Sequence, residues 1–269
     1  MNANLLEPLP AMVPAVEKAY AVFSRYRAPG HLLDVCTHCC MDAALEKDMR
    51  RLPLRQLAAM HFYQYNTSAK SEVQPADEIK YFLPRMLELL SQGAELHYST
   101  ELYLDRVGRC EPGAFSVQER AAIDAFALAF FSKGLDRHHW QAHAQAPDPF
   151  IGSNAFDILL MFDLGGIALE PLLAHWLKAR GSGATLHYVD ASYWDFWKTQ
   201  EIENAFAADR PAFRRTMKSW LLDAGHRERF AEKMLAFDVS TFDSADGRGC
   251  GTGMGPKQIL ESVFDLIGG

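Results

Sequence analysis

The chain has 269 residues, a formal net charge of −7 and five cysteines. This length can bury the core of one or two domains. The negative charge disfavours nucleic acid as a partner. An odd number of cysteines, three of them adjacent or nearly so, argues against an extracellular disulfide framework and favours a reducing compartment.

Two stretches bear on membranes and location. The first ten residues include Glu7 and two prolines and have no basic segment, which does not match a secretory signal peptide. The strongly apolar run at 123–131 is interrupted by Asp124 and is far shorter than the ~20 residues that span a bilayer. We therefore expect a cytoplasmic protein with no membrane partner.

Thiols and an imidazole are concentrated in Cys36-Thr37-His38-Cys39-Cys40, just before a helix expected from Asp42 onward. Cys36-x-x-Cys39 is the spacing at which two thiolates from one turn bind a tetrahedral Zn²⁺, with His38 or Cys40 as a third ligand. Zinc is therefore the candidate cofactor.

A complete zinc site needs four donors, and the chain has no second C-x-x-C. The missing donors would have to come from distant residues such as Cys110, Cys250 or a histidine. Two other interpretations stay open. The helix dipole would stabilise a thiolate for redox chemistry, although the usual βαβ scaffold is missing. Alternatively the cysteines are small buried apolar residues, which suits Cys40 best.

Hydrophobic periodicity predicts helices along the chain. One apolar stripe has the 3.6-residue period of a helix, and Pro84 inside it predicts a kink or a split into two stacked helices. Ser116 and Glu119 form a capping box that opens a second helix, with Gly134 as its stop. The residues of the first stripe are Ile79, Phe82, Leu83, Met86, Leu87 and Leu90.

The second half continues the helical pattern. Apolar stripes at 169–177 and 213–221 predict helices that end near Gly181 and Gly225, and a last helix begins at Pro256. The segment 184–189 is only a weak strand candidate. We predict an all-α fold, a multi-helix array and conceivably a superhelix of stacked helix pairs. It forms one domain over 1–269, with a candidate subdivision near 144–151.

Three further segments carry candidate chemistry. If this segment is helical, His139 and His143 lie at i and i+4, a spacing that can bind a metal ion. The glutamate of the H-E-x-x-H motif is missing, and an interaction of the histidines with the helix dipole is the favoured interpretation.

The glycine-rich run 247–255 matches no phosphate-binding motif, and we expect it to be a surface loop or a partner-contacting lid. The aromatic stretch 187–197 should be mostly core, with Tyr193, Trp194 and Trp197 as candidate contacts for a partner protein.

Part of the first third resembles a family of uncharacterised bacterial proteins. The resemblance rests on Cys36 and Cys39, on a P-L-R-x-L element at 53–57, and on the D-E-x-K-x-F-L-P-R pattern at 77–85. That family has no established function, so the resemblance implies no activity. It directs attention to Cys36 and Cys39 rather than Cys40.

No nucleophile elbow, kinase signature or EF-hand occurs in the sequence, which disfavours an enzyme. The leading hypothesis is a cytoplasmic helical module that binds another protein, for example as the neutralising partner of a toxin. The alternative is a metal-dependent or thiol-dependent enzyme centred on Cys36 and Cys39.

Overall fold

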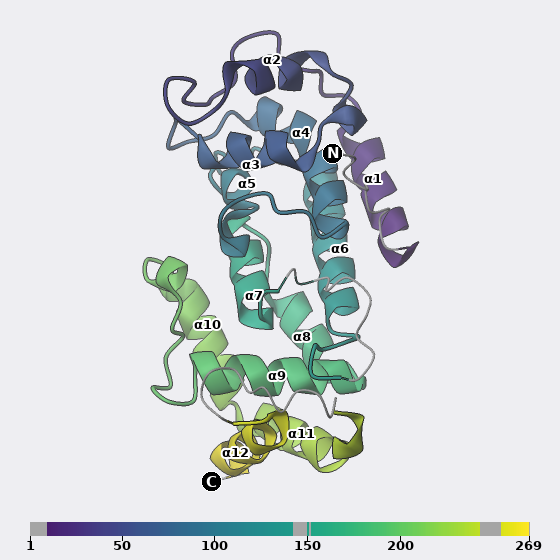
Figure 1. Ribbon diagram of the computed structural model, residues 1–269, viewed down its shortest axis with the longest axis vertical. Coiled ribbons are helices and arrows are strands. Elements are labelled where there is room, and N and C mark those ends of the chain that lie inside the picture. Colours follow the sequence, from purple (N-terminus) through teal and green to yellow (C-terminus); the bar gives the residue numbers. More distant parts are fainter. Residues whose placement is uncertain (1–9, 142–149, 151, 243–253, 269) are drawn as a thin grey trace. The chain divides into compact units, whose positions relative to one another are not determined.

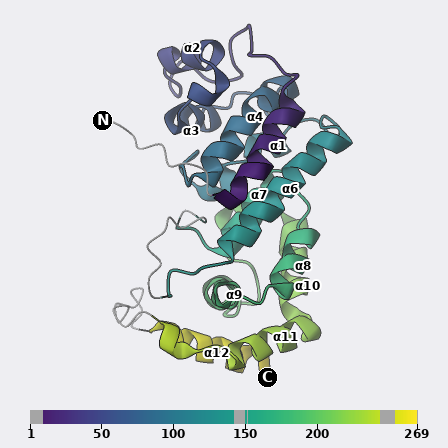
Figure 2. The same cartoon turned by 90° about the vertical axis from the view of Figure 1, so that its right-hand side faces the viewer.

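The computed structural model describes residues 10–141, 150, 152–242 and 254–268, and within these ranges every regular element is a helix (Figures 1 and 2). Apart from three isolated bridges there is no β-structure in these ranges, so the predicted all-α class is confirmed. No helix in the described part of the chain is both long enough and apolar enough to cross a membrane. The α-helices are α1 (Val13–Phe23), α2 (Ala43–Arg51), α3 (Ala59–Thr67), α4 (Ala76–Ser91), α5 (Asp105–Gly108), α6 (Val117–Gly134), α7 (Ala155–Leu164), α8 (Glu170–Lys178), α9 (Ser182–Asp195), α10 (Pro211–Leu222), α11 (Ala224–Leu235) and α12 (Pro256–Gly268).

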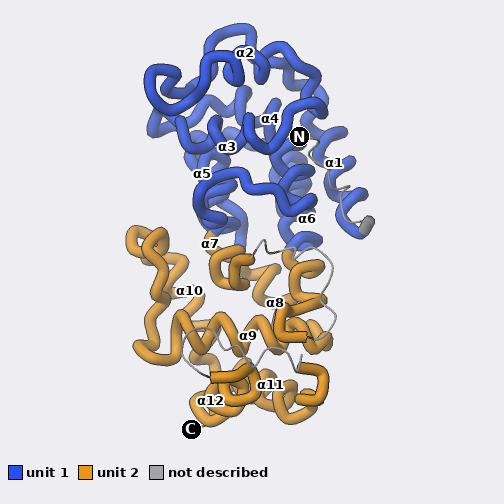
Figure 3. Tube along the Cα trace, viewed as in Figure 1, with its two compact units in different colours: residues 1–130, 161–168 blue, residues 131–160, 169–269 orange. Residues whose placement is uncertain are grey.

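The chain divides into two compact units (Figure 3). Unit 1 comprises residues 1–130 and 161–168, and unit 2 comprises residues 131–160 and 169–269. The division therefore falls within α6 and α7. The subdivision suggested near 144–151 lies almost entirely outside the described residues, and the single folding domain stays a prediction.

Local signals placed several helix ends correctly. The capping box is present, because the Ser116 N–H donates to Glu119 at 2.8 Å and the Glu119 N–H donates to the Ser116 hydroxyl at 3.3 Å. α6 ends at Gly134 and α12 begins at Pro256, as predicted.

The split predicted at Pro84 and the helix end predicted at Gly225 were wrong, whereas the kink at Pro84 stays a prediction. α4 runs through Pro84 without being split, because proline removes only one backbone donor and the surrounding helix is almost wholly buried. Gly225 does not end α10, since it lies inside α11. The break falls at Asp223, whose carboxylate accepts the His226 N–H at 2.9 Å and so caps the next helix.

The core of unit 1 is built around α4, against which α1 packs (Figure 1). Four charged residues of α4 are buried together with its apolar stripe: Glu78, Lys80, Arg85 and Glu88. Buried charges need partners, because an isolated one costs several kcal/mol. Each of the four accordingly makes at least one ion pair.

Two of these pairs join α4 to distant segments of unit 1. Glu78 accepts the Tyr65 hydroxyl at 2.8 Å and lies 3.7 Å from the Arg106 guanidinium, which itself stacks 3.6 Å from the Tyr65 ring centre. Lys80 pairs with Glu119 of α6 at 3.4 Å. Glu78, Lys80 and Arg85 are the buried charged residues of the D-E-x-K-x-F-L-P-R pattern at 77–85. Their ion pairs therefore give them a role in packing the core.

The core of unit 2 is aromatic. Trp176 of α8 stacks on Trp220 of α10 at 5.3 Å between ring centroids, and Tyr188 of α9 stacks on Phe230 of α11 at 3.8 Å. α12 packs against α9 and α11, as Figure 2 shows. The expectation that most of the 187–197 aromatics are core is met by Tyr188, Phe196 and Trp197, which are buried.

Candidate metal centre

The cysteine loop, residues 36–41, is fixed at both ends. Before it, Val35 forms an antiparallel bridge with Ala69, and the Cys36 N–H donates to the Ser68 carbonyl at 2.8 Å. After it, the Asp42 carboxylate caps α2 by accepting the Ala44 N–H at 2.6 Å. The loop is a turn held between two anchors.

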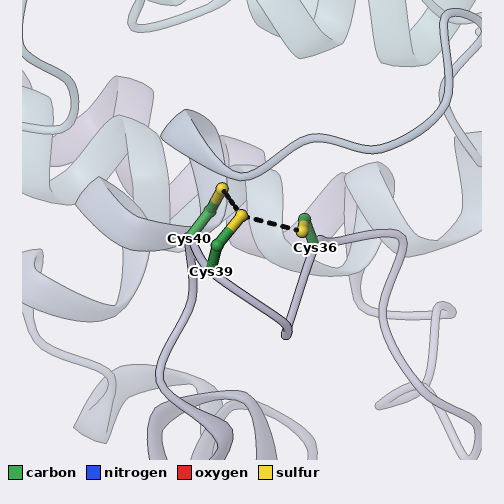
Figure 4. A group of neighbouring side chains, drawn as sticks. All are labelled: Cys36, Cys39 and Cys40. Carbon is green, nitrogen blue, oxygen red and sulfur yellow. Dashed lines mark hydrogen bonds between the residues drawn. The ribbon is translucent and has the colours of Figure 1, made fainter.

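The loop brings its three thiols together (Figure 4). The sulfur atoms of Cys36 and Cys39 lie 3.5 Å apart and those of Cys39 and Cys40 lie 3.0 Å apart. All three lie within 4.8 Å of one another. Cys36 is half-buried, whereas Cys39 and Cys40 are exposed. The interpretation of these residues as buried packing groups was therefore wrong, and it was wrong for Cys40 in particular.

Backbone amides act on the first thiol. The N–H groups of Cys39 and His38 point at the Cys36 sulfur and lower its pKa to about 7. The middle thiol shows the opposite effect: hydrogen bonds of the Cys39 thiol to the Cys40 and Cys36 sulfurs, together with repulsion from their charges, raise the pKa of Cys39 to about 12. One thiolate thus forms readily, while a second is favoured only when a cation compensates its charge.

The distant donors proposed from the sequence do not complete this set in the described part of the chain. His38 is exposed and is not among the donor atoms of the cluster. Cys110 is half-buried and its thiol contacts the Arg106 carbonyl at 3.6 Å; burial raises its pKa to about 11. Cys250 lies outside the described residues.

A cavity of about 640 Å³ adjoins the loop. Thr37, which follows Cys36 directly, lines it, and the carboxylates of Asp34 and Glu78 belong to the same wall. This cavity could not be predicted from the sequence, because its walls come from 31–37 and from 70–78 and meet only in the fold.

The other candidate residues are dispersed. Tyr193 and Trp194 are half-buried, and Trp197 is 7% exposed, so little of Trp197 is available to a partner. His139 lies in a turn after α6 rather than in a helix, and His143 is outside the described residues, as is the glycine-rich run up to residue 253.

Comparison with known proteins gave no match: no family model, no curated protein and no solved structure is significantly similar to this chain.

The geometry of the cluster suits a soft or borderline metal ion. With Zn–S bonds of ~2.3 Å, tetrahedral thiolates are separated by roughly 3.8 Å. The distance between the Cys36 and Cys39 sulfurs is close to this value. The distance between the Cys39 and Cys40 sulfurs would have to grow by somewhat less than 1 Å to reach it. Three thiols on one anchored turn thus offer three of the four donors of a tetrahedral metal-binding shell.

Proposed function

We propose that the loop at residues 36–41 binds a thiophilic metal ion through Cys36, Cys39 and Cys40. The observation that supports this is the convergence of three sulfur atoms within 4.8 Å on one anchored turn. Thiolates select Zn²⁺ and Cu⁺ over hard cations. Three of them satisfy trigonal Cu⁺, whereas Zn²⁺ would keep one position open for water or another ligand, as catalytic zinc sites do.

The exposure of Cys39 and Cys40 places the bound ion at the surface of unit 1. An open ligand position there is within reach of solvent and of small molecules. The zinc form therefore fits a site that exchanges its fourth ligand, beside a cavity that holds two carboxylates. The proposal keeps the thiol-centred alternative drawn from the sequence; the protein partner stays a prediction.

The test is a spectroscopic titration of the full chain, kept reduced, with Co²⁺ or Cd²⁺. Both ions give thiolate-to-metal charge-transfer absorption, whose intensity scales with the number of bound thiolates. We expect one equivalent to saturate a three-thiolate band. Cys36→Ser, Cys39→Ser and Cys40→Ser should each lower the band by about a third and weaken binding at least tenfold.

Cys110→Ser is the matched control, because Cys110 is a free thiol of the same unit that lies outside the cluster. It should bind like the unmodified chain. The proposal would be abandoned if the unmodified chain gave no charge-transfer band, or if Cys110→Ser reduced the band as much as Cys39→Ser.

A second candidate rests on the 3.5 Å separation of the Cys36 and Cys39 sulfurs, and the lowered pKa of Cys36 beside the raised pKa of Cys39 supports it. A thiolate beside a protonated thiol reduces disulfides: Cys36 attacks, one thiol leaves, and Cys39 then closes an internal disulfide and releases the other thiol. Glutathione disulfide is the probe. This chemistry requires the chain to lose two hydrogens by mass and two thiols by titration, with Cys110→Ser unaffected. A chain that stays fully reduced under an excess of the probe would rule it out.

A further inference from the structure

We propose a second metal site, in unit 2, where His138, His139 and Asp190 bind a divalent transition-metal ion such as Zn²⁺, Ni²⁺ or Co²⁺. The site is independent of the cysteine cluster and uses nitrogen and oxygen donors only. Two imidazoles and one carboxylate are a donor set that suits these ions.

The three donors come from two segments that are far apart in the sequence. His138 and His139 follow α6, and Asp190 lies on α9. The His138 Nε2 and the Asp190 Oδ2 are 3.2 Å apart, and one donor atom from each of the three residues lies within 4.8 Å of the others. Adjacent ligands of an octahedral or tetrahedral ion with bonds of ~2.1 Å are separated by roughly 3.0 to 3.4 Å. The separation of the His138 and Asp190 donors falls in that range.

The donors differ in burial in the way an accessible site requires. The His138 side chain is 1% exposed and that of Asp190 is 16% exposed, while His139 is exposed. All three line a cavity of about 440 Å³, together with Ser153, Asn154, Asp157 and His187. An ion that enters from solvent meets His139 first and two nearly buried ligands behind it.

The segment that carries the histidines is held against α9 by two contacts. The His187 Nε2–H donates to the Arg137 carbonyl at 2.7 Å and to the Gly134 carbonyl at 3.1 Å. Gly183 allows the close approach: a Cβ there would lie 2.6 Å from the Leu135 carbonyl oxygen. The spacing between His138 and Asp190 is therefore set by packing outside the donors, which is how a preorganised site is built.

Binding requires a change in one proton. The Trp140 N–H donates to the His138 Nδ1 at 3.3 Å, so the ring proton is on Nε2 and faces Asp190. A bound ion takes the Nε2 position, so the proton moves to Nδ1 and the Trp140 amide loses its acceptor. The Trp140 ring, 4.7 Å from the His138 ring, should report this change in its fluorescence.

The experiment uses the full chain without an affinity tag and with Cys36, Cys39 and Cys40 all replaced by serine, so that the thiol site is silent. Calorimetric titration with Ni²⁺ or Zn²⁺ should give one bound ion per chain and no thiolate charge-transfer band with Co²⁺. His139→Gln and Asp190→Asn should each raise the Kd at least tenfold. His138 is left in place because it is buried.

His175→Gln and Asp209→Asn are the matched controls, since neither residue lines the cavity. Both should bind like the parent. The proposal is overturned if the serine-substituted chain binds no ion, or if His139→Gln and Asp190→Asn keep the parent affinity. Either result leaves the thiol site untouched, because that site is tested by its charge-transfer band in the unmodified chain.

Discussion

The two units stabilise their interiors by different means. In unit 1, α4 buries four charged side chains: Glu78 and Lys80 pair with Arg106 and Glu119 from other segments, and Arg85 and Glu88 pair with each other. In unit 2, the corresponding place is taken by the rings of Trp176, Tyr188, Trp220 and Phe230. A buried ion pair is costly to form and more costly to break, whereas aromatic packing tolerates small changes of shape.

We therefore expect the stability of unit 1 to be sensitive to the loss of a single charge and to acid. The stability of unit 2 should be sensitive mainly to the volume of its buried side chains. The chain offers a convenient way to separate the two. All five tryptophans, at 140, 176, 194, 197 and 220, belong to unit 2. Tryptophan fluorescence therefore follows unit 2, and far-ultraviolet circular dichroism follows the helices of both units.

The largest effect is expected for Arg106→Ala. The guanidinium is 1% exposed and is the cationic partner of Glu78, and it also donates to the Tyr65 carbonyl at 2.8 Å. Its removal leaves a buried carboxylate without its cationic partner, which should cost about 3–5 kcal/mol of unfolding free energy. Denaturant titration should show the loss in circular dichroism, with the tryptophan transition moved less.

Arg109→Ala is the control, because Arg109 pairs with Asp105 at a half-exposed position and should cost no more than about 1 kcal/mol. If the two variants were equally stable, the buried pairs of α4 would not be what distinguishes unit 1.

A smaller effect is expected from acid acting on Glu119. Burial favours its neutral form, but hydrogen bonds from the Tyr26 hydroxyl and the Ser116 N–H, with Lys80 nearby, outweigh burial and lower its pKa to about 2. A carboxyl whose pKa is depressed by folding stabilises the fold above its unfolded pKa, and this contribution is lost as the pH falls from about 4.5 to about 2. Because its partner Arg25 is exposed and screened, we expect about 1–2 kcal/mol.

Glu119→Gln should flatten that part of the stability profile of unit 1, measured by denaturation at several pH values. Glu232→Gln, on the surface of unit 2, should leave the profile unchanged. A parent profile that is already flat between pH 4.5 and 2 would contradict the assignment.

The smallest effect is expected for Tyr188→Phe in unit 2. The Tyr188 hydroxyl is buried and has no hydrogen-bond partner among the residues that the structure describes, so its removal should change stability by less than about 1 kcal/mol, in the stabilising direction. Trp176→Phe is the counterpart: its Nε1–H donates to the Ala184 carbonyl at 2.8 Å, and the change should cost about 1–2 kcal/mol. Circular dichroism measures both; a large loss for Tyr188→Phe would show that the hydroxyl has a partner.

Helices could be predicted from the sequence wherever one apolar stripe dominated, as in α4, α8, α10 and α12. Hydrophobic periodicity could not predict the buried ion pairs of α4. Glu78 pairs with Arg106, 28 positions along the chain, whereas periodicity reports only on residues that are close in sequence. Pro84 and Gly225 misled for the same reason: a local breaker signal was outweighed by burial in α4 and by the Asp223 cap of α11.

The two candidate metal sites also differ in how far apart their residues lie in the sequence. The cysteines are adjacent, so the sequence identified them, although it could not show that Cys40 joins the cluster or that a cavity adjoins it. His138 and Asp190 are 52 positions apart and meet only when α9 packs against the segment after α6. The spacing of His139 and His143 predicted a metal-binding pair on one helix face, but His139 lies in a turn after α6 and His143 is outside the described residues.

In unit 2, position 183 should be unusually intolerant of substitution. Even alanine there would drive its methyl group into the backbone at 135–137, while Gly181, two residues earlier, has open space around it. A mutational scan scored by cation affinity should therefore find a sensitive position that touches no ion. Because Gly183 has no side chain, it lets α9 approach closely enough to set the distance between His138 and Asp190. Evolutionary change at the proposed site is therefore restricted at a residue that does not itself bind the ion.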